Sequence, residues 1–282
     1  MAEHSRACSI CICADDFGQR AGINEAVLRL VHRERVHAVG CLVGAPAWAS
    51  GSAHLRDVAA DRLDAGLHLD FTEAPLLHRP ARPLPALIAD SSLGRLDAAA
   101  VAAEIHAQLD AFEQAMGRPP AFVDGHQHVH QLPVIRQQLL LALQARRYGR
   151  SPWLRSTRHA RAGAFDWKPR LIEALGAGPL AAACERSGYR QNGRLLGVYD
   201  FTGGEQRYAA LLRGWLQQAR QGDLLMCHPG LGTDAQDPVA VARAAEYAVL
   251  ASPAIGELLE ASGIRLRPMS RILALPGRGH PP

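Results

Sequence analysis

The sequence predicts an α/β protein built as a single-domain β/α barrel, TIM-like in plan and either distorted or seven-stranded. Short strand-like runs alternate with longer helical runs, the pattern of parallel strands joined by crossover helices. The 282 residues show no internal repeat and no dividing linker. We therefore expect one domain over residues 1–275 and a flexible tail over 276–282.

Eight short runs have the character of strands. Their expected bounds, which can shift by a few residues, are 8–14, 36–43, 64–70, 121–126, 152–156, 194–199, 223–228 and 264–268. Between them, apolar residues spaced i, i+3 and i+4 predict helices over 22–34, 97–116, 133–147, 169–186, 205–220 and 238–262. The Pro-rich segment 72–95 is the longest irregular stretch, and such loops are usually functional lids or disordered.

Composition excludes several classes of protein. Hydrophobic residues make up 48% and charged residues 21% of the chain, close to the globular average. A net charge of +4 is too small to indicate nucleic acid as the main partner. We see no export signal and no apolar run long enough for a membrane span, so we expect a cytoplasmic protein. The six cysteines are expected to be reduced thiols, since three of them share one short strand.

The candidate functional residues gather at the C-terminal ends of four predicted strands, where β/α barrels place their active sites. They are Asp15 and Asp16 after the first strand, His68 and Asp70 at the end of the third, Asp124, His126, His128 and His130 after the fourth, and His228 at the end of the seventh.

Asp15 and Asp16 are adjacent carboxylates that directly follow an apolar strand. Two such groups cannot both be buried as ions without a shared cation. The alternative is that they cap the next helix or turn the chain with Gly18.

His228 ends a strand that breaks at once into Pro229-Gly230. This position suits a general acid or base at the barrel mouth. The alternative is a histidine that only caps the turn.

The histidines at 126, 128 and 130 have the spacing i, i+2 and i+4, which would place them on one side of an extended strand. Histidine is the commonest metal ligand among side chains, and a neighbouring carboxylate such as Asp124 often orients the ring. This cluster is therefore a strong ligand candidate, against the alternative of a satisfied core cluster. His68 alone indicates less, because it could equally be a core histidine.

Four motifs, in order along residues 14–230, resemble the YdjC-like family, which includes chitooligosaccharide deacetylases and hopanoid-biosynthesis-associated deacetylases. They are Ala14-Asp15-Asp16-Phe17-Gly18, Gly66-Leu67-His68-Leu69, Asp124-Gly125-His126-Gln127-His128-Val129-His130 and Cys227-His228-Pro229-Gly230. The resemblance implies a barrel related to polysaccharide deacetylases and removal of an acetyl group from an N-acetylated sugar.

By the same resemblance, Asp16, His68 and His126 would bind one divalent ion, zinc or magnesium, with Asp15 as the base and His228 as the acid. Three protein ligands would leave positions open for water and substrate, as at a catalytic ion. The chain departs from many relatives in its Asp-Gly before His126 and in its more polar residues after Leu69. The second departure concerns the substrate rather than the metal.

Other candidates lie near further strand ends. Arg155, at the end of the fifth predicted strand, could orient Asp15 or hold a substrate oxygen, or be a surface arginine. Trp48 and Tyr199 could pack on a sugar ring, with core packing as the alternative.

A basic run follows the fifth predicted strand and favours an anionic substrate, such as a phosphate-bearing or lipid-linked acetamido sugar, unless the run is solvated surface. It comprises Arg155, Arg158, His159, Arg161, Lys168 and Arg170. Apolar residues of segment 72–95 could contact the lipid. Two rival functions stay open: another mono- or dinuclear metallohydrolase, and a non-catalytic sugar-binding scaffold. The oligomeric state is also open, a homodimer included.

Overall fold

The computed structural model describes residues 8–159, 167–232, 234 and 236–275, and all eight predicted strands are present. They are β1 (Cys8–Phe17), β2 (Ala38–Cys41), β3 (Asp64–Leu69), β4 (Phe122–Gly125), β5 (Trp153–Leu154), β6 (Leu195–Leu196), β7 (Leu224–Cys227) and β8 (Ile264–Leu266). The predicted tail 276–282 lies outside the described residues.

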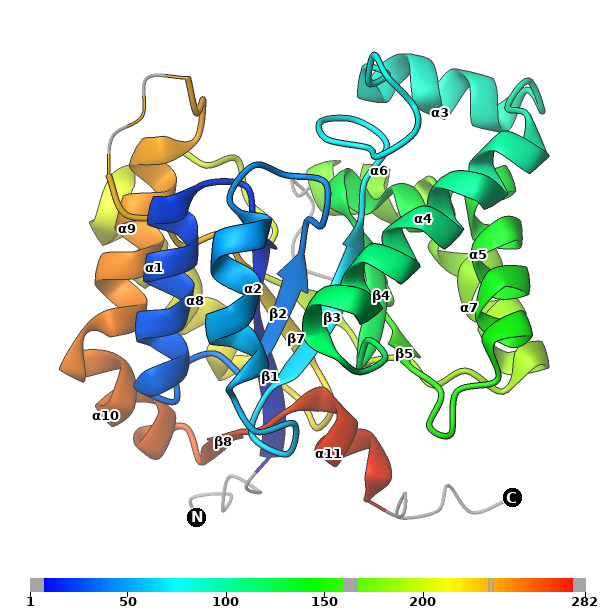
Figure 1. The fold of residues 1–282 in the computed structure, drawn as a ribbon. Coiled ribbons are helices and arrows are strands. Elements are labelled where there is room, and N and C mark those ends of the chain that lie inside the picture. Colours follow the sequence, from blue (N-terminus) through cyan, green and yellow to red (C-terminus); the bar gives the residue numbers. More distant parts are fainter. Residues whose placement is uncertain (1–7, 160–166, 233, 235, 276–282) are drawn as a thin grey trace, which may run out of the picture.

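The strands form one curled parallel sheet in the order β5-β4-β3-β2-β1-β7-β6 (Figure 1). Among the described residues, two isolated bridges join β5, β6 and the segments beside them, one between Leu154 and Gln191 and one between His159 and Leu195. The eight-stranded sheet is thus a distorted half-barrel with β8 outside its main path, and the predicted fold class is confirmed.

The last strand does not enter the barrel between β7 and β1. Cys8 N–H donates to Gly263 O beside β8, and the Ile10 carbonyl accepts from Arg267. Further along the same edge of β1, the Ile12 carbonyl accepts from His37, which leads into β2. Because alternate residues of a parallel strand bond to the same neighbour, β8 and β2 share one edge of β1. β7 can therefore pair directly with the other edge.

The helices cover the outer side of the curled sheet, and Figure 1 shows α1, α2 and α8–α10 on one flank and α3–α7 on the other. Their bounds are α1 (Ala21–His32), α2 (Trp48–Arg56), α3 (Leu84–Ser92), α4 (Ala98–Met116), α5 (Pro133–Arg146), α6 (Trp167–Ala174), α7 (Ala177–Ser187), α8 (Gly204–Gln217), α9 (Ala240–Ala251), α10 (Pro253–Ala261) and α11 (Met269–Ala274).

Two predicted helices are each divided in two. The helix expected over 238–262 breaks at Ser252, which is extended as residues before proline tend to be, and Pro253 starts α10. The helix expected over 169–186 breaks at Gly176, whose φ of 149° favours glycine. A Cβ at Gly176 would also lie 2.3 Å from the Gln131 carbonyl oxygen. The breaks let each half pack separately.

Segment 72–95 is less irregular than predicted, because it contains α3 and is anchored by two buried carboxylates. Asp70 accepts hydrogen bonds from the backbone N–H groups of Thr72, Glu73 and Ala74. Glu104 of α4 accepts those of residues 76–78. The segment is therefore fixed against the barrel at the carboxyl end of β3.

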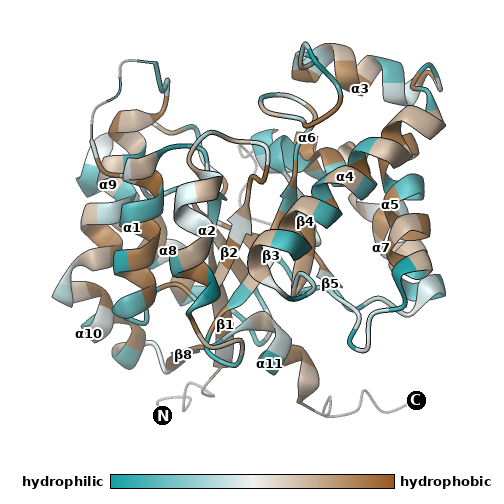
Figure 2. Cartoon of the chain, viewed as in Figure 1, coloured by the Kyte–Doolittle hydropathy of each residue, from teal (hydrophilic) through white to brown (hydrophobic). Residues whose placement is uncertain are grey.

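The strands are mainly hydrophobic in Figure 2, whereas the helices carry both hydrophobic and hydrophilic residues. This matches strands buried between the barrel interior and a helical layer. Among the described residues, no helix is long and apolar enough to cross a membrane. All six cysteines are free, and five of them are buried.

Candidate active site

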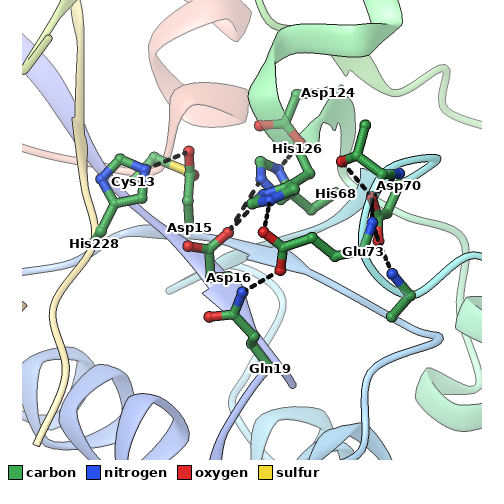
Figure 3. Close-up of polar contacts among 12 residues, drawn as sticks. Cys13, Asp15, Asp16, Gln19, His68, Asp70, Glu73, Asp124, His126 and His228 are labelled. Atoms are coloured by element: carbon green, nitrogen blue, oxygen red, sulfur yellow. Dashed lines mark hydrogen bonds and ion pairs between the residues drawn. The ribbon is translucent and has the colours of Figure 1, made fainter. Parts of the chain in front are cut away.

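The carboxyl ends of β1, β3, β4 and β7 bring the predicted metal ligands, base and acid to one cavity of about 610 Å³. Figure 3 shows the carboxylates of β1 beside the histidines that follow β3, β4 and β7. The cavity lining includes Asp15, Asp16, His68, His126, His128, Tyr199 and His228, together with Gln19, Glu73 and Arg243, which were not predicted.

Asp15 and Asp16 both reach this cavity because β1 is irregular at its end. Successive side chains of a regular strand point to opposite faces. Here the pairing with β2 shifts register between Ala14 and Phe17, and Asp16 has a φ of 67°. Both carboxylates are 1% exposed, so the local backbone holds two adjacent acids in the interior.

Asp16 faces two imidazole rings. Its Oδ1 lies 3.0 Å from His126 Nδ1 and 3.6 Å from His68 Nε2. Burial raises the pKa of Asp16, but the positive potential of His126 and Arg243 outweighs it, so the pKa stays well below the usual range. Asp16 is therefore an anion at neutral pH.

Carboxylates hold both rings from the far side. Asp124 Oδ1 lies 2.7 Å from His68 Nδ1, and Glu73 Oε1 lies 2.9 Å from His126 Nε2. A carboxylate accepts the N–H of a neutral imidazole, which leaves the other ring nitrogen with a lone pair. With no ion bound, burial lowers the pKa of both rings, but the carboxylates around them outweigh burial and raise it overall. The nitrogens that face Asp16 would therefore present lone pairs once a bound ion has displaced the proton.

This arrangement fits a divalent cation. Asp16 Oδ1 is buried and accepts no hydrogen bond, although it faces the two ring nitrogens. The ligand atoms of Asp16, His68 and His126 lie within 4.8 Å of one another. One carboxylate oxygen and two ring nitrogens this close, with both rings held by outer carboxylates, match the donor set of a catalytic zinc-type site.

A second cluster, formed by Asp15, His68 and Asp124, already has its cation. Arg155 is fully buried, and its two terminal nitrogens each lie 2.6 Å from an oxygen of Asp15. Arg155 Nη2 also lies 2.7 Å from Asp124 Oδ2. Burial raises the pKa of Asp15, but the charge of Arg155 outweighs it and lowers the pKa overall. Arg155 is thus not a surface arginine.

His228 lies across the cavity from the two histidines, with its Nε2 4.0 Å from Asp15 Oδ2. Burial lowers its pKa to about 4, so the ring is neutral at pH 7. The backbone N–H of His228 donates to the buried Glu246 of α9, at 2.5 Å. The other oxygen of Glu246 accepts from the Tyr199 hydroxyl, and burial raises the pKa of this acid to about 7.

The histidines at 126, 128 and 130 do not share one face, and the predicted extended geometry is wrong. Residues His126–Gln131 form a 3₁₀ segment, and Gln127 and His128 have φ values of 52° and 61°. Of the three, only His126 belongs to the ligand group. His128 lines the cavity, and burial lowers its pKa well below the usual range. His130 is buried, with Nε2 3.0 Å from the Arg155 carbonyl oxygen.

The other predicted residues lie in different places. Trp48 packs between Phe17 and Phe112 and is 6% exposed. Tyr199 does line the cavity, and Asp70 anchors backbone as described above.

The basic run is not one continuous surface. Arg155 points inward to the site, and Lys168 donates to the Tyr199 carbonyl and lies over the Phe201 ring. Arg170 is exposed on α6, and Arg161 lies outside the described residues. The sequence did hold a signal for Arg243 and Glu246, since they are charged residues three positions apart in an otherwise apolar stretch of α9.

The sequence is similar to those of known proteins. A family model described as YdjC-like protein matches residues 9–261. A human carbohydrate deacetylase is 27% identical, over 90% of this chain and 88% of its own length. A chitooligosaccharide deacetylase of Enterobacter sp. (strain 638) is 26% identical, over 90% and 94%.

Two solved structures share the fold. One, described as a cellobiose-phosphate cleavage protein of Enterococcus faecalis V583, has a TM-score of 0.67 at 21% identity and covers 94% of this chain and 98% of its own. The peptidoglycan N-acetylglucosamine deacetylase Bc1960 has a TM-score of 0.51 at 11% identity, with coverage of 93% and 86%.

Proposed function

Because this chain belongs to the YdjC-like protein family, we propose that it is a metal-dependent hydrolase that removes the acetyl group from an N-acetylated sugar. The observation that carries the proposal is the buried Asp16 Oδ1, which accepts no hydrogen bond and faces two oriented imidazoles beside the pair of Asp15 and His228. The names of the two relatives support the substrate class.

Asp16, His68 and His126 would hold the ion, which, when bound, polarises the amide carbonyl and lowers the pKa of an attacking water. Two imidazoles and a carboxylate suit zinc better than magnesium, which prefers oxygen ligands. Both carboxylates of the second cluster are already paired with Arg155. We therefore propose one ion rather than the two of a dinuclear metallohydrolase.

The chain's own residues then move one proton. Asp15, fixed by the Arg155 fork, accepts the proton of the attacking water. His228 is neutral at pH 7 and is the stronger base of the two, so the proton can pass to it through a water that bridges the 4.0 Å between the groups. As the C–N bond breaks, His228 gives this proton to the departing amine, and the products are acetate and an amino sugar.

The cavity lining supports an acetamido sugar that carries an apolar group. Its wall includes Leu84 and Ile88 of α3, Trp167 and Leu171 of α6, and Leu175 directly after α6. Arg155 and Arg243 are paired with carboxylates, and Lys168 of the lining donates to the Tyr199 carbonyl. We therefore propose a lipid-linked rather than a phosphate-recognised substrate.

An acetate-release assay tests the function. An N-acetylglucosaminide with a long alkyl aglycone should be used better than a chitooligosaccharide or an anionic N-acetyl sugar. Treatment with EDTA should abolish release, and zinc should restore it. Absence of acetate from every N-acetyl sugar, with metal bound, would leave the sugar-binding scaffold as the better description. If acetate were released from the chitooligosaccharide as well as from the alkyl N-acetylglucosaminide, the substrate would not need an apolar aglycone.

A further inference from the structure

We propose that Arg243 of α9 is a positioning residue for the metal site, and this inference rests on the ligand set proposed above. Its Nη2 donates to Asp16 Oδ2 at 2.7 Å. The carboxylate therefore has one oxygen engaged and the other, Oδ1, left for the ion. Arg243 decides which oxygen of Asp16 is the ligand and holds it towards the two imidazoles.

Arg243 is also connected to His126 by a series of side-chain hydrogen bonds. Its Nη2 donates to Gln19 Oε1 at 3.0 Å, and Gln19 Nε2 donates to Glu73 Oε2 at 2.6 Å. Glu73 in turn holds His126, whose other nitrogen faces Asp16 (Figure 3). Since arginine can only donate, it fixes the Gln19 amide with its N–H₂ group towards Glu73. One guanidinium thus supports two of the three ligands.

The Arg243 side chain has little freedom to leave this position. It is 5% exposed, and its Nε donates to Asp237 Oδ2 at 2.8 Å. The turn after His228 packs directly on it. A Cβ at Gly230 would lie 3.0 Å from Arg243 Cβ and 3.1 Å from its Cδ. Because Gly230 has no side chain, the Arg243 side chain can pack against this turn.

The alternative role is charge balance alone, and it predicts the opposite effect on the metal. A cation this close to the site repels a divalent ion. If Arg243 only neutralised carboxylates, its removal would tighten metal binding. If it orients Asp16 and His126, its removal weakens binding, because outer residues that orient ligands typically contribute about 10- to 100-fold to metal affinity.

The test is equilibrium dialysis of zinc with the full-length chain and its variants. Arg243→Gln should weaken binding by about 10- to 100-fold. Gly230→Ala, which changes no charge, should also weaken it by displacing the arginine. The control is Asp237→Asn, which keeps the bond from Arg243 to Asp16 and should bind zinc almost as wild type does. Thermal melts would identify folded variants, and if Arg243→Gln does not fold, Gly230→Ala decides.

Unchanged or tighter binding in a folded Arg243→Gln would overturn the proposal, as would wild-type affinity in Gly230→Ala when the arginine variant does not fold. An equal loss in Asp237→Asn would show that any disturbance beside Arg243 weakens binding, whether or not the bond to Asp16 is kept, and would also overturn it. A wild-type chain that binds zinc but releases no acetate would refute the proposed function alone. A wild-type chain that binds no zinc would refute both.

Discussion

The division of labour between the two adjacent aspartates follows from their neighbours. Asp16 has an oxygen free to face two imidazole nitrogens, whereas both oxygens of Asp15 are held by Arg155. A carboxylate that an arginine already neutralises is a poor ligand for a second cation. It is nevertheless well placed to receive a proton from a water in the cavity.

We therefore predict that Asp15→Asn binds one equivalent of metal and loses turnover, by about 100-fold or more, the usual contribution of a general base. The asparagine amide cannot accept the proton of the attacking water. Metal content and acetate release should be measured on the same preparation. The matched variant is Asp16→Asn, which should lose metal and turnover together. Near wild-type turnover in Asp15→Asn would show that another group is the base.

The sequence indicates which of these side chains are special but not how they are oriented. Asp15, Asp16 and His68 lie at the carboxyl ends of predicted strands, and in any parallel barrel these ends lie together. The spacing of the three histidines could not reveal that positive φ values at Gln127 and His128 turn the chain there. Such backbone conformations depend on packing against segments that are distant in the sequence. The same is true of the hydrogen bonds by which Glu73 and Arg243 hold His126 and Asp16.

At the scale of elements, the helix predictions were accurate where a hydrophobic stripe runs unbroken. The expected helices over 97–116 and 133–147 differ from α4 and α5 by one residue each. The break at Gly176 was not predicted, because the periodic pattern continues across it. α3 was missed since prolines mark its start at Pro83 and Pro85, and these read as loop signals.

α6 is the element for which we expect a direct effect on substrate choice. It has no buried residue, yet Trp167 and Leu171, one turn apart, line the cavity while 70% and 51% exposed. Apolar side chains left this exposed around a cavity can bury their surface against an apolar ligand.

We predict that Trp167→Ala combined with Leu171→Ala raises KM about tenfold or more for an alkyl N-acetylglucosaminide, since each buried apolar side chain contributes on the order of 1.5–3 kcal/mol. KM for a short soluble N-acetyl sugar should stay unchanged. Leu141→Ala on α5 is the matched control, because Leu141 is equally exposed, at 51%, and does not line the cavity. An equal rise in KM for both substrates would assign α6 to sugar binding instead.

At the scale of the whole molecule, the barrel was predictable and its closure was not. Alternating strands and helices predict parallel pairing, but the position of β8 beside the start of β1 depends on how tightly the sheet curls. The proposed ion would join three parts of this incomplete barrel, since its ligands come from β1, β3 and the segment after β4.

Such a link should be measurable in global stability. An ion that binds only the folded chain at 100 times its Kd adds about 2.7 kcal/mol to the free energy of unfolding. For a chain of 282 residues this corresponds to a shift in Tm of roughly 5 °C, taking about 2 °C per kcal/mol. We therefore predict that EDTA lowers the Tm of the wild-type protein by about this amount and that added zinc restores it.

His126→Ala separates the ion from other effects of the chelator. It removes one ligand, so its Tm should be low and should respond little to either EDTA or zinc. Asp15→Asn keeps all three ligands and should show the full wild-type response. If EDTA shifts the Tm of His126→Ala as much as that of the wild type, the stabilising ion binds elsewhere, and the assignment of Asp16, His68 and His126 as its ligands would have to be abandoned.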